Sequence, residues 1–353
     1  MVNKRVENRA IDEISASVQL NCFISDARYG SEYGLCTYLL KMREYFRWER
    51  GLGCSGIIDQ NEMGEWLSER EEMWKGLEGR EFGSVIVEDG EFDPFNSESI
   101  NARLNRDGLV YSGGIGRFGR PHFFLGELER RVDYPDYTLL ISGRELARDL
   151  TAPPAMTRDG VIYVRRESLR QMLWEKLESW RWQRPDTPLG RAFSYYAFDT
   201  DLEGSLDRMT DDELNQVLLH ERGECIAGGW LGDGWNRMIA DLTHTPAELA
   251  ARAVRDHLAD CWVTLPETLE QGRDSSLHFF VGNLNAMRKT LFPGLRRAYD
   301  KWLEDADTSL LEAVAEEGLE HWKSVAKAML KLHAGKGKRA AATIARVAEK
   351  SSF

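Results

Sequence analysis

The chain has 353 residues, of which 42% are hydrophobic and 10% aromatic, enough to build a substantial core, and this excludes extensive disorder. Its formal net charge of −12 argues against general affinity for nucleic acid, because phosphate contacts require clustered Lys and Arg side chains. No stretch approaches the roughly 20 apolar residues of a membrane-spanning helix, so we expect no membrane partner.

The start of the chain and its cysteines both indicate a cytoplasmic protein. The first twenty residues carry charges throughout and lack the apolar segment of a signal peptide. The cysteines are odd in number, widely spaced and without a CxxC pair: Cys22, Cys36, Cys54, Cys225 and Cys261. A disulfide framework or a cysteine-only zinc site is therefore not expected.

Residues 1–80 are predicted to be helical. Apolar residues recur close to the 3.6-residue period in EYGLCTYLLKMREYFRWERGL, and Gly51 and Gly53 are placed to end this helix. A second helix is expected through EMGEWLSEREEMWKGL. The sequence thus begins with an N-terminal helical region.

Residues 81–165 are predicted to form a β-rich middle region. Short runs rich in β-branched and aromatic residues alternate with glycine and proline turns: FGSVIVEDG, GLVYSGG, RPHFFLGELERR, YTLLISG and DGVIYVRRE. Because most spacings are too short for a crossover helix, we expect a small antiparallel meander of about five strands.

A glycine-rich loop in this region matches the dinucleotide-binding pattern G-x-G-x-x-G at Gly114, Gly116 and Gly119. That site requires a helix to begin at the last glycine. A strand-like run follows instead, so a hairpin loop is the preferred interpretation. Arg117 and Arg120 leave open that the loop holds an anion.

Residues 166–334 are predicted to form a C-terminal helical bundle, followed by a basic tail at 335–353. Thr210 with Glu213, and Thr245 with Pro246 and Glu248, are typical helix-start signals. From His321 onward the chain carries eight Lys or Arg and one acid. This basic segment is interpreted as a solvated helix and tail, with a protein partner as the alternative.

Polar side chains accompany the apolar face of the first helix of this bundle. In LNQVLLHERGECIAGGW the apolar face is defined by Leu214, Leu218 and Cys225, and Glu221 falls within about 60° of its centre. A carboxylate is not expected there without a partner. Glu224 and His220 border the same face.

Two further helices repeat the pattern. His257 and Asp260, at positions i and i+3, border the apolar stripe of ELAARAVRDHLADCWVTLPETL. His278 lies beside the apolar side chains of SSLHFFVGNLNAM. Three consecutive helices therefore each offer a histidine close to an apolar face.

Imidazole and carboxylate groups that project inward from facing helices are typical ligands of iron, manganese or zinc. His220, Glu224, His257, Asp260 and His278 are the predicted metal ligands, and Glu221 is the predicted catalytic residue, as a general base acting on metal-bound water or as a further ligand. The pattern is neither HExxH nor the Glu-x-x-His pair of di-iron bundles. A metal-free network with nearby arginines, or a metal-free acid–base pocket, stays open.

Much of the chain is similar to a family of uncharacterised bacterial proteins. The resemblance lies in NCFISDARYGSEYGLCTYLLKMREYFRWERG, RFGRPHFFLGEL, IYVRRESLRQMLWEKLESWRW, LLHERGE, VRDHLADCWVTLP and SLHFFVGNLNAMRK. It covers Asn21 to about Trp322 and contains no active-site motif. It implies a bacterial protein of one recurrent architecture, and it carries no functional residues.

The sequence thus predicts an α+β protein, mostly α, with a helical bundle in the C-terminal half and a small antiparallel β-meander in the middle. The preferred function is a metal-dependent enzyme that acts on a small-molecule substrate by hydrolysis or oxidation, with its site between the C-terminal helices. The alternative is a non-catalytic binding or scaffold protein with a buried His/Glu/Arg network. In an enzyme these residues should line a polar pocket, whereas in a scaffold they should pair with arginines.

Overall fold

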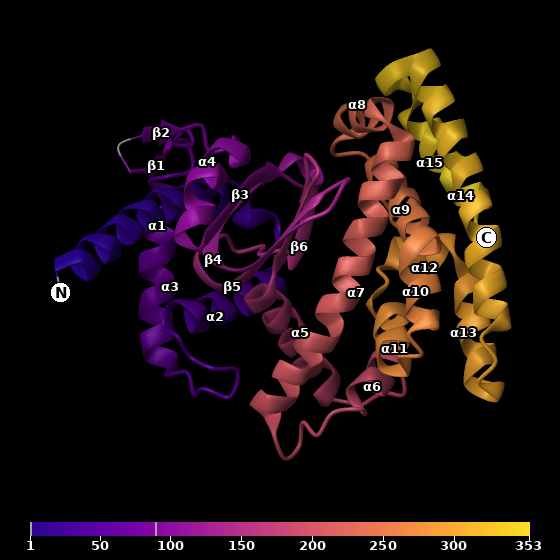
Figure 1. Ribbon diagram of the computed structural model, residues 1–353, viewed down its shortest axis with the longest axis horizontal. Coiled ribbons are helices and arrows are strands. Elements are labelled where there is room, and N and C mark those ends of the chain that lie inside the picture. Colours follow the sequence, from indigo (N-terminus) through magenta and orange to yellow (C-terminus); the bar gives the residue numbers. More distant parts are fainter. Residues whose placement is uncertain (1, 89) are drawn as a thin grey trace. The chain divides into compact units, whose positions relative to one another are not determined.

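The structure is a computed structural model that describes residues 2–88 and 90–353, without the side chains of residues 2–10 and 117 (Figure 1). The chain divides into two compact units. The first comprises Met1–Glu175 with Leu202–Leu206, and the second comprises Lys176–Asp201 with Asp207–Phe353. The described chain is mostly helical, with its strands confined to the first unit and helices throughout the second.

Three long helices begin the first unit, in the region that the sequence predicts to be helical, although only the second and third were predicted as individual helices. They are α1 (Val2–Tyr29), α2 (Leu35–Glu49) and α3 (Gln60–Lys75), and a shorter α4 (Ser97–Leu104) follows. Gly51 adopts a positive φ of 62° just after α2, as expected for a residue that ends a helix. Asp59 caps α3 by accepting hydrogen bonds from the backbone of Asn61 and Glu62.

The strands form two sheets. β1 (Val85–Val87) and β2 (Gly90–Phe92) make a two-stranded antiparallel ribbon. The larger sheet has the order β3-β4-β5-β7-β6, and its strands are β3 (Leu109–Ile115), β4 (Pro121–Asp133), β5 (Thr138–Arg148), β6 (Ala155–Arg158) and β7 (Val161–Arg165). Register shifts between β4 and β5 around Gly126 mark bulges, which increase local twist.

The expected antiparallel meander is correct only for β3, β4 and β5, because β7 pairs with β5 in parallel. Residues 149–160 separate these two strands, which is about the dozen residues a parallel connection needs. β6 occupies part of this connection and pairs antiparallel with β7 across Asp159-Gly160. Both turn residues have positive φ, 49° and 73°, as in a type I′ hairpin turn.

The glycine-rich loop is a hairpin connection, as preferred from the sequence. Ile115 of β3 pairs with Pro121 of β4, and only residues 116–120, which include the short turn Arg117–Gly119, lie between them. No helix that could hold a pyrophosphate begins in this loop. Arg120 pairs with Glu32 and lies over the ring of Tyr33, whereas the side chain of Arg117 lies outside the described ones.

Side chains alternate between the two faces of the larger sheet, as the period of a strand requires. Tyr111, Phe123 and Leu125 pack against α1, while Val110 and Phe124 pack on the opposite face with Tyr163. A separate cluster of large aromatic and aliphatic side chains joins α1, α2 and α3. The first unit therefore has its own core.

The second unit is a helical bundle around a large apolar cluster. Its elements run from α5 (Arg166–Arg181), which starts in the first unit, through α6 (Pro188–Phe193), α7 (Leu202–Leu231), α8 (Asp233–Leu242), α9 (Pro246–Ala259), the π-helical segment Asp260–Thr264, α10 (Leu265–Glu270), α11 (Asp274–Asn283), α12 (Ala286–Leu291), α13 (Pro293–Asp305) and α14 (Ser309–Lys336) to α15 (Ala341–Lys350). No described helix is both long and apolar enough to cross a membrane.

Of the two predicted helix starts, one is confirmed and one is wrong. Thr245 caps α9 by accepting a hydrogen bond from the backbone of Glu248, with Pro246 in the first turn. Thr210 and Glu213 instead lie inside α7, which begins at Leu202, and both are buried. Glu213 therefore belongs to the core of the bundle and not to a cap.

Candidate functional site

Three of the predicted polar residues, His220, Glu224 and Asp260, meet where α7 and α9 pack together. His220 and Glu224 are one helical turn apart on α7, and Asp256 and Asp260 are one turn apart from the end of α9 into the π-helical segment. Gly223 makes the contact between the helices possible, since a Cβ there would lie 2.5 Å from the carbonyl oxygen of Ala259. The missing side chain thus allows two pairs of polar groups to face each other.

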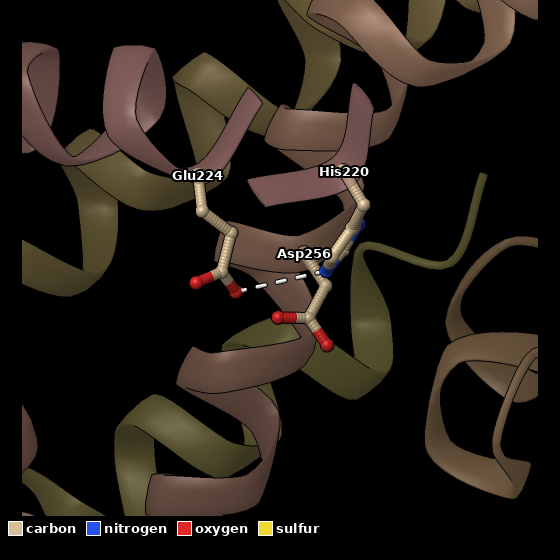
Figure 2. A group of neighbouring side chains, drawn as sticks. All are labelled: His220, Glu224 and Asp256. Carbon is tan, nitrogen blue, oxygen red and sulfur yellow. Dashed lines mark ion pairs between the residues drawn. The ribbon is translucent and has the colours of Figure 1, made fainter. Parts of the chain in front are cut away.

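His220 is central to this group, and Figure 2 shows its ring directed toward Glu224 and Asp256. Its Nδ1 lies 2.9 Å from Oδ1 of Asp260, and its Nε2 lies 3.8 Å from Oε1 of Glu224. A carboxylate only accepts hydrogen bonds, so Nδ1 carries the proton and Nε2 keeps its lone pair when the ring is neutral. The lone pair is on the side of Glu224 and Asp256.

Asp260 is fixed from two sides. It is almost fully buried, accepts the hydrogen bond from His220 and pairs through Oδ2 with the guanidinium of Arg288 on α12. It is also the first residue of the π-helical segment Asp260–Thr264. Short π-helical segments are rare and are frequent at functional sites.

Glu224 is held ionised by its surroundings. Nη2 of Arg255 donates to both of its carboxylate oxygens, at 2.8 and 2.9 Å. Burial alone would raise the pKa of Glu224, but Arg255 and His220 outweigh it and hold the pKa at about 2. Glu221, one of the predicted residues, is also buried on α7, and its charge acts on Arg255.

Two of the predicted ligands lie elsewhere. His257 is fully buried, stacks on Trp322 and directs Nε2 to the carbonyl oxygen of Arg288 at 3.2 Å. His278 places Nδ1 2.7 Å from the hydroxyl of Tyr299 and packs against Trp302. The structure therefore brings His220, Glu224 and Asp260 together, but not these two histidines.

Sequence reasoning missed Asp256. One ligand atom from each of His220, Glu224 and Asp256 lies within 4.8 Å of the others, and this is the one such group found in the described part of the chain. The i, i+4 spacing of Asp256 and Asp260 could have indicated it. Arg288 was missed as well, because its contact with Asp260 joins segments 28 residues apart.

A second polar cluster, also missed, surrounds Glu213 on α7. Its Oε1 accepts a hydrogen bond from Ser276 at 3.2 Å, while Oε2 has no partner. Burial raises the pKa of Glu213 to about 8. One turn on, Gln216 accepts a hydrogen bond from Thr268 at 2.9 Å. In the sequence, this cluster is marked only by the Thr-x-x-Glu pattern of Thr210 and Glu213, which is typical of a helix cap.

Comparison with protein families accounts for nearly the whole chain. Residues 13–165 match the N-terminal domain, and residues 170–351 the C-terminal domain, of a family of unknown function, DUF6866. The chain belongs to this family. No curated protein and no solved structure matches it. All residues of the α7/α9 site lie in the C-terminal DUF6866 domain.

The donor set of this DUF6866 site suits a divalent transition metal. It offers one imidazole nitrogen and two carboxylate groups, and such mixed nitrogen and oxygen donors suit zinc, iron or manganese. Three carboxylates, those of Glu224, Asp256 and Asp260, face two guanidiniums, which leaves negative charge for a cation to offset. The residues therefore fit a metal ion.

Proposed function

We propose that the protein is a divalent-metal-dependent enzyme that acts on a small molecule by hydrolysis or oxidation, with its metal held by His220, Glu224 and Asp256. The observation that carries this proposal is the approach of their three ligand atoms to within 4.8 Å of one another. A bound ion would act as a Lewis acid toward substrate. Iron, manganese and zinc are the ions that the donors favour.

The surroundings of His220 support this role. In metal sites, a ligating histidine commonly donates its other ring N–H to a carboxylate, which fixes the ring and makes it a better ligand. Asp260 is the carboxylate that accepts this hydrogen bond, with Oδ1 2.9 Å from Nδ1 of His220, and Arg288 pairs with Asp260. Asp260 is then a positioning residue, while Glu221 keeps its proposed role as general base.

The imidazole is also accessible from outside. The side chain of His220 is 25% exposed and that of Glu224 is 13% exposed, whereas Asp260 behind them is almost fully buried. An ion held by three protein groups would keep coordination positions for substrate, as catalytic sites do and closed structural sites do not.

The second candidate is a non-catalytic binding or scaffold protein in which the same residues form a metal-free network. The pairing of Glu224 with Arg255 and of Asp260 with Arg288 favours it, because arginines can balance buried carboxylates without an ion. The two candidates differ in whether the cluster binds a metal at physiological concentration.

Elemental analysis of protein purified without a histidine tag separates them. We expect near-stoichiometric iron, manganese or zinc in the wild type, and its loss in His220→Ala and Asp256→Ala. His333→Ala is the matched control, because His333 lies in the same unit but bonds to Asp241 instead of the cluster. Equal, negligible metal in all four proteins would favour the network.

If metal is present, the enzymatic part is tested next. Metal-stripped and metal-restored protein would be assayed on a panel of small ester, amide, phosphoester and oxidisable substrates. Turnover that returns with the metal and is lost in Glu221→Gln, while metal content stays unchanged, would support Glu221 as the base. Metal without any turnover would indicate a binding protein.

A further inference from the structure

The first unit contains a cavity of about 260 Å³ that has no part in the proposed metal site. Its wall combines three arginines with an aromatic and an aliphatic side chain: Arg47, Arg148, Arg170, Trp48 and Leu52. Ligand pockets commonly measure about 300–1,000 Å³, so this one suits a ligand smaller than most.

Arg148 is a buried cation that shares its nearest carboxylate, that of Glu145, with Arg165. It is 1% exposed, and its closest acidic atom is Oε2 of Glu145 at 3.5 Å. Glu145 already accepts two hydrogen bonds from Arg165, at 3.0 and 2.5 Å, and one from Ser168. Nε and Nη1 of Arg148 consequently have no hydrogen-bond partner.

Leaving a guanidinium buried and incompletely bonded is costly. Stacking on the ring of Trp48, 5.4 Å from the guanidinium carbon, offsets only part of that cost. An anion placed in the cavity would offset the remainder, and the planar fork of Arg148 suits a carboxylate.

Two more arginines line the wall and offer further N–H donors. Arg47 donates to the carbonyl oxygens of Gly53 and Gly56, and its Nε lies 3.5 Å from Oε1 of Glu44 without a hydrogen bond to it. Arg170 donates to the sulfur of Cys54 at 3.1 Å and pairs with Glu203. These contacts position both guanidiniums at the cavity.

The acidic residues of the wall leave Arg148 without a hydrogen-bonded carboxylate. Glu44 and Glu167 line the cavity, and burial raises the pKa of both carboxyl groups despite nearby arginines. Glu44 is already bonded by Arg43 at 2.7 Å, and Glu167 accepts a hydrogen bond from the backbone of Glu145. Arg170 is therefore paired with Glu203 and Arg47 lies next to Glu44, so Arg148 is the guanidinium of the wall with the weakest pairing to a carboxylate.

We propose that this cavity binds a small organic carboxylate with a planar, apolar body, its carboxylate on Arg148 and Arg47 and its body against Trp48 and Leu52. The ring of Trp48 and the side chain of Leu52 supply the apolar contact. The incompletely bonded guanidinium of Arg148 supplies the driving force for the charged group.

Calorimetric titration of the full-length protein with benzoate and with benzamide tests the proposal. The two probes have the same planar body and differ in charge. We expect benzoate to bind one site at low ionic strength, and benzamide to bind about tenfold more weakly or not at all. Equal binding of both probes, or no benzoate binding up to millimolar concentration, would overturn the proposal.

Variants then place the binding in this cavity. Arg47→Gln and Arg148→Lys should each weaken benzoate binding about tenfold or more, because each removes part of the guanidinium recognition. Arg144→Gln is the matched control, since Arg144 is exposed and pairs with Glu127. If Arg148→Lys fails to fold, the benzoate affinity of Arg47→Gln still shows whether benzoate binds in this cavity. Unchanged affinity in Arg47→Gln would overturn the placement.

Discussion

His257 shows most clearly how the environment of a single residue determines its chemistry. The ring is fully buried between Trp322 and Phe292, and its Nδ1 has no hydrogen-bond partner. Burial, with the charge of Arg288, lowers the pKa of His257 to about 3. The residue is neutral throughout the physiological range and acts as part of the aromatic core.

This lowered pKa predicts a defined dependence of stability on pH. Between about pH 6.5 and pH 3 the unfolded chain binds a proton at His257 that the folded chain does not, so folding stability falls as the pH falls. We expect the wild type to lose about 2 kcal/mol more than His257→Phe between pH 7.5 and pH 5. Urea unfolding of both proteins at these two pH values measures the difference.

The same variant distinguishes the structural role of His257 from the metal role predicted from sequence. His257→Phe keeps a ring for Trp322 to stack on but offers no ligand atom. We expect the variant to retain the metal content of the wild type. A loss of metal, or a parallel pH dependence in both proteins, would contradict the assignment of His257 to the core.

At the scale of elements, the contact between α7 and α9 depends on Gly223. Gly223→Ala would place a Cβ 2.5 Å from the carbonyl oxygen of Ala259, and a backbone atom cannot move aside cheaply. We expect a loss of about 1–3 kcal/mol of stability and weaker metal binding, because the two pairs of polar residues are forced apart. Thermal unfolding and metal titration measure the two effects.

Gly228 provides the matched control on the same helix. It is exposed, and a Cβ there would meet no atom within 4 Å. Gly228→Ala should stabilise α7 by about 0.5–1 kcal/mol, since alanine is the better helix former. If both alanine variants were stabilised, the close approach at Gly223 would not exist.

Short-range patterns in the sequence, namely helical periodicity and capping residues, predicted several helices and one helix start. The helices α2 and α3 and the cap of α9 at Thr245 follow from periodicity and capping residues alone. The parallel pairing of β5 with β7 was not predictable in this way. β6 and β7 form a local hairpin, but which strand pairs with the other edge of β7 depends on contacts with the rest of the sheet. The Thr210/Glu213 pattern predicted a false helix start, because α7 already begins at Leu202 and both residues are buried inside the bundle.

The candidate site was predicted in part. Helical periodicity alone placed His220 and Glu224 beside an apolar face, and the structure brings both to α9. Which α9 side chains face them depends on the rotation of that helix, which the contact between Gly223 and Ala259 fixes. A single sequence does not contain that information, so His257 was preferred over Asp256.

At the scale of the whole molecule, the two units have separate cores and match the two domains of one family. The basic C-terminal segment is part of the second unit, because Ile344 and Ala348 of α15 are buried in its core. The backbone of Phe353 donates to Leu291, and His321 contacts the carbonyl oxygen of Ser351. A protein partner for this segment stays a prediction.

The proposed sites lie one in each unit, so each can be tested without disturbing the other. The metal site depends on α7 and α9, and the carboxylate cavity on α2, α5 and the end of β5. The proposed function rests on the first of them. Its existence is therefore the central claim.

Crystals of the full-length protein grown with manganese or zinc, measured at the absorption edge of the metal, would test that claim most directly. We predict one strong anomalous peak about 2.0–2.2 Å from Nε2 of His220 and from carboxylate oxygens of Glu224 and Asp256. A map without a peak there, in which Arg255 still bridges both oxygens of Glu224, would contradict the account and leave a metal-free network.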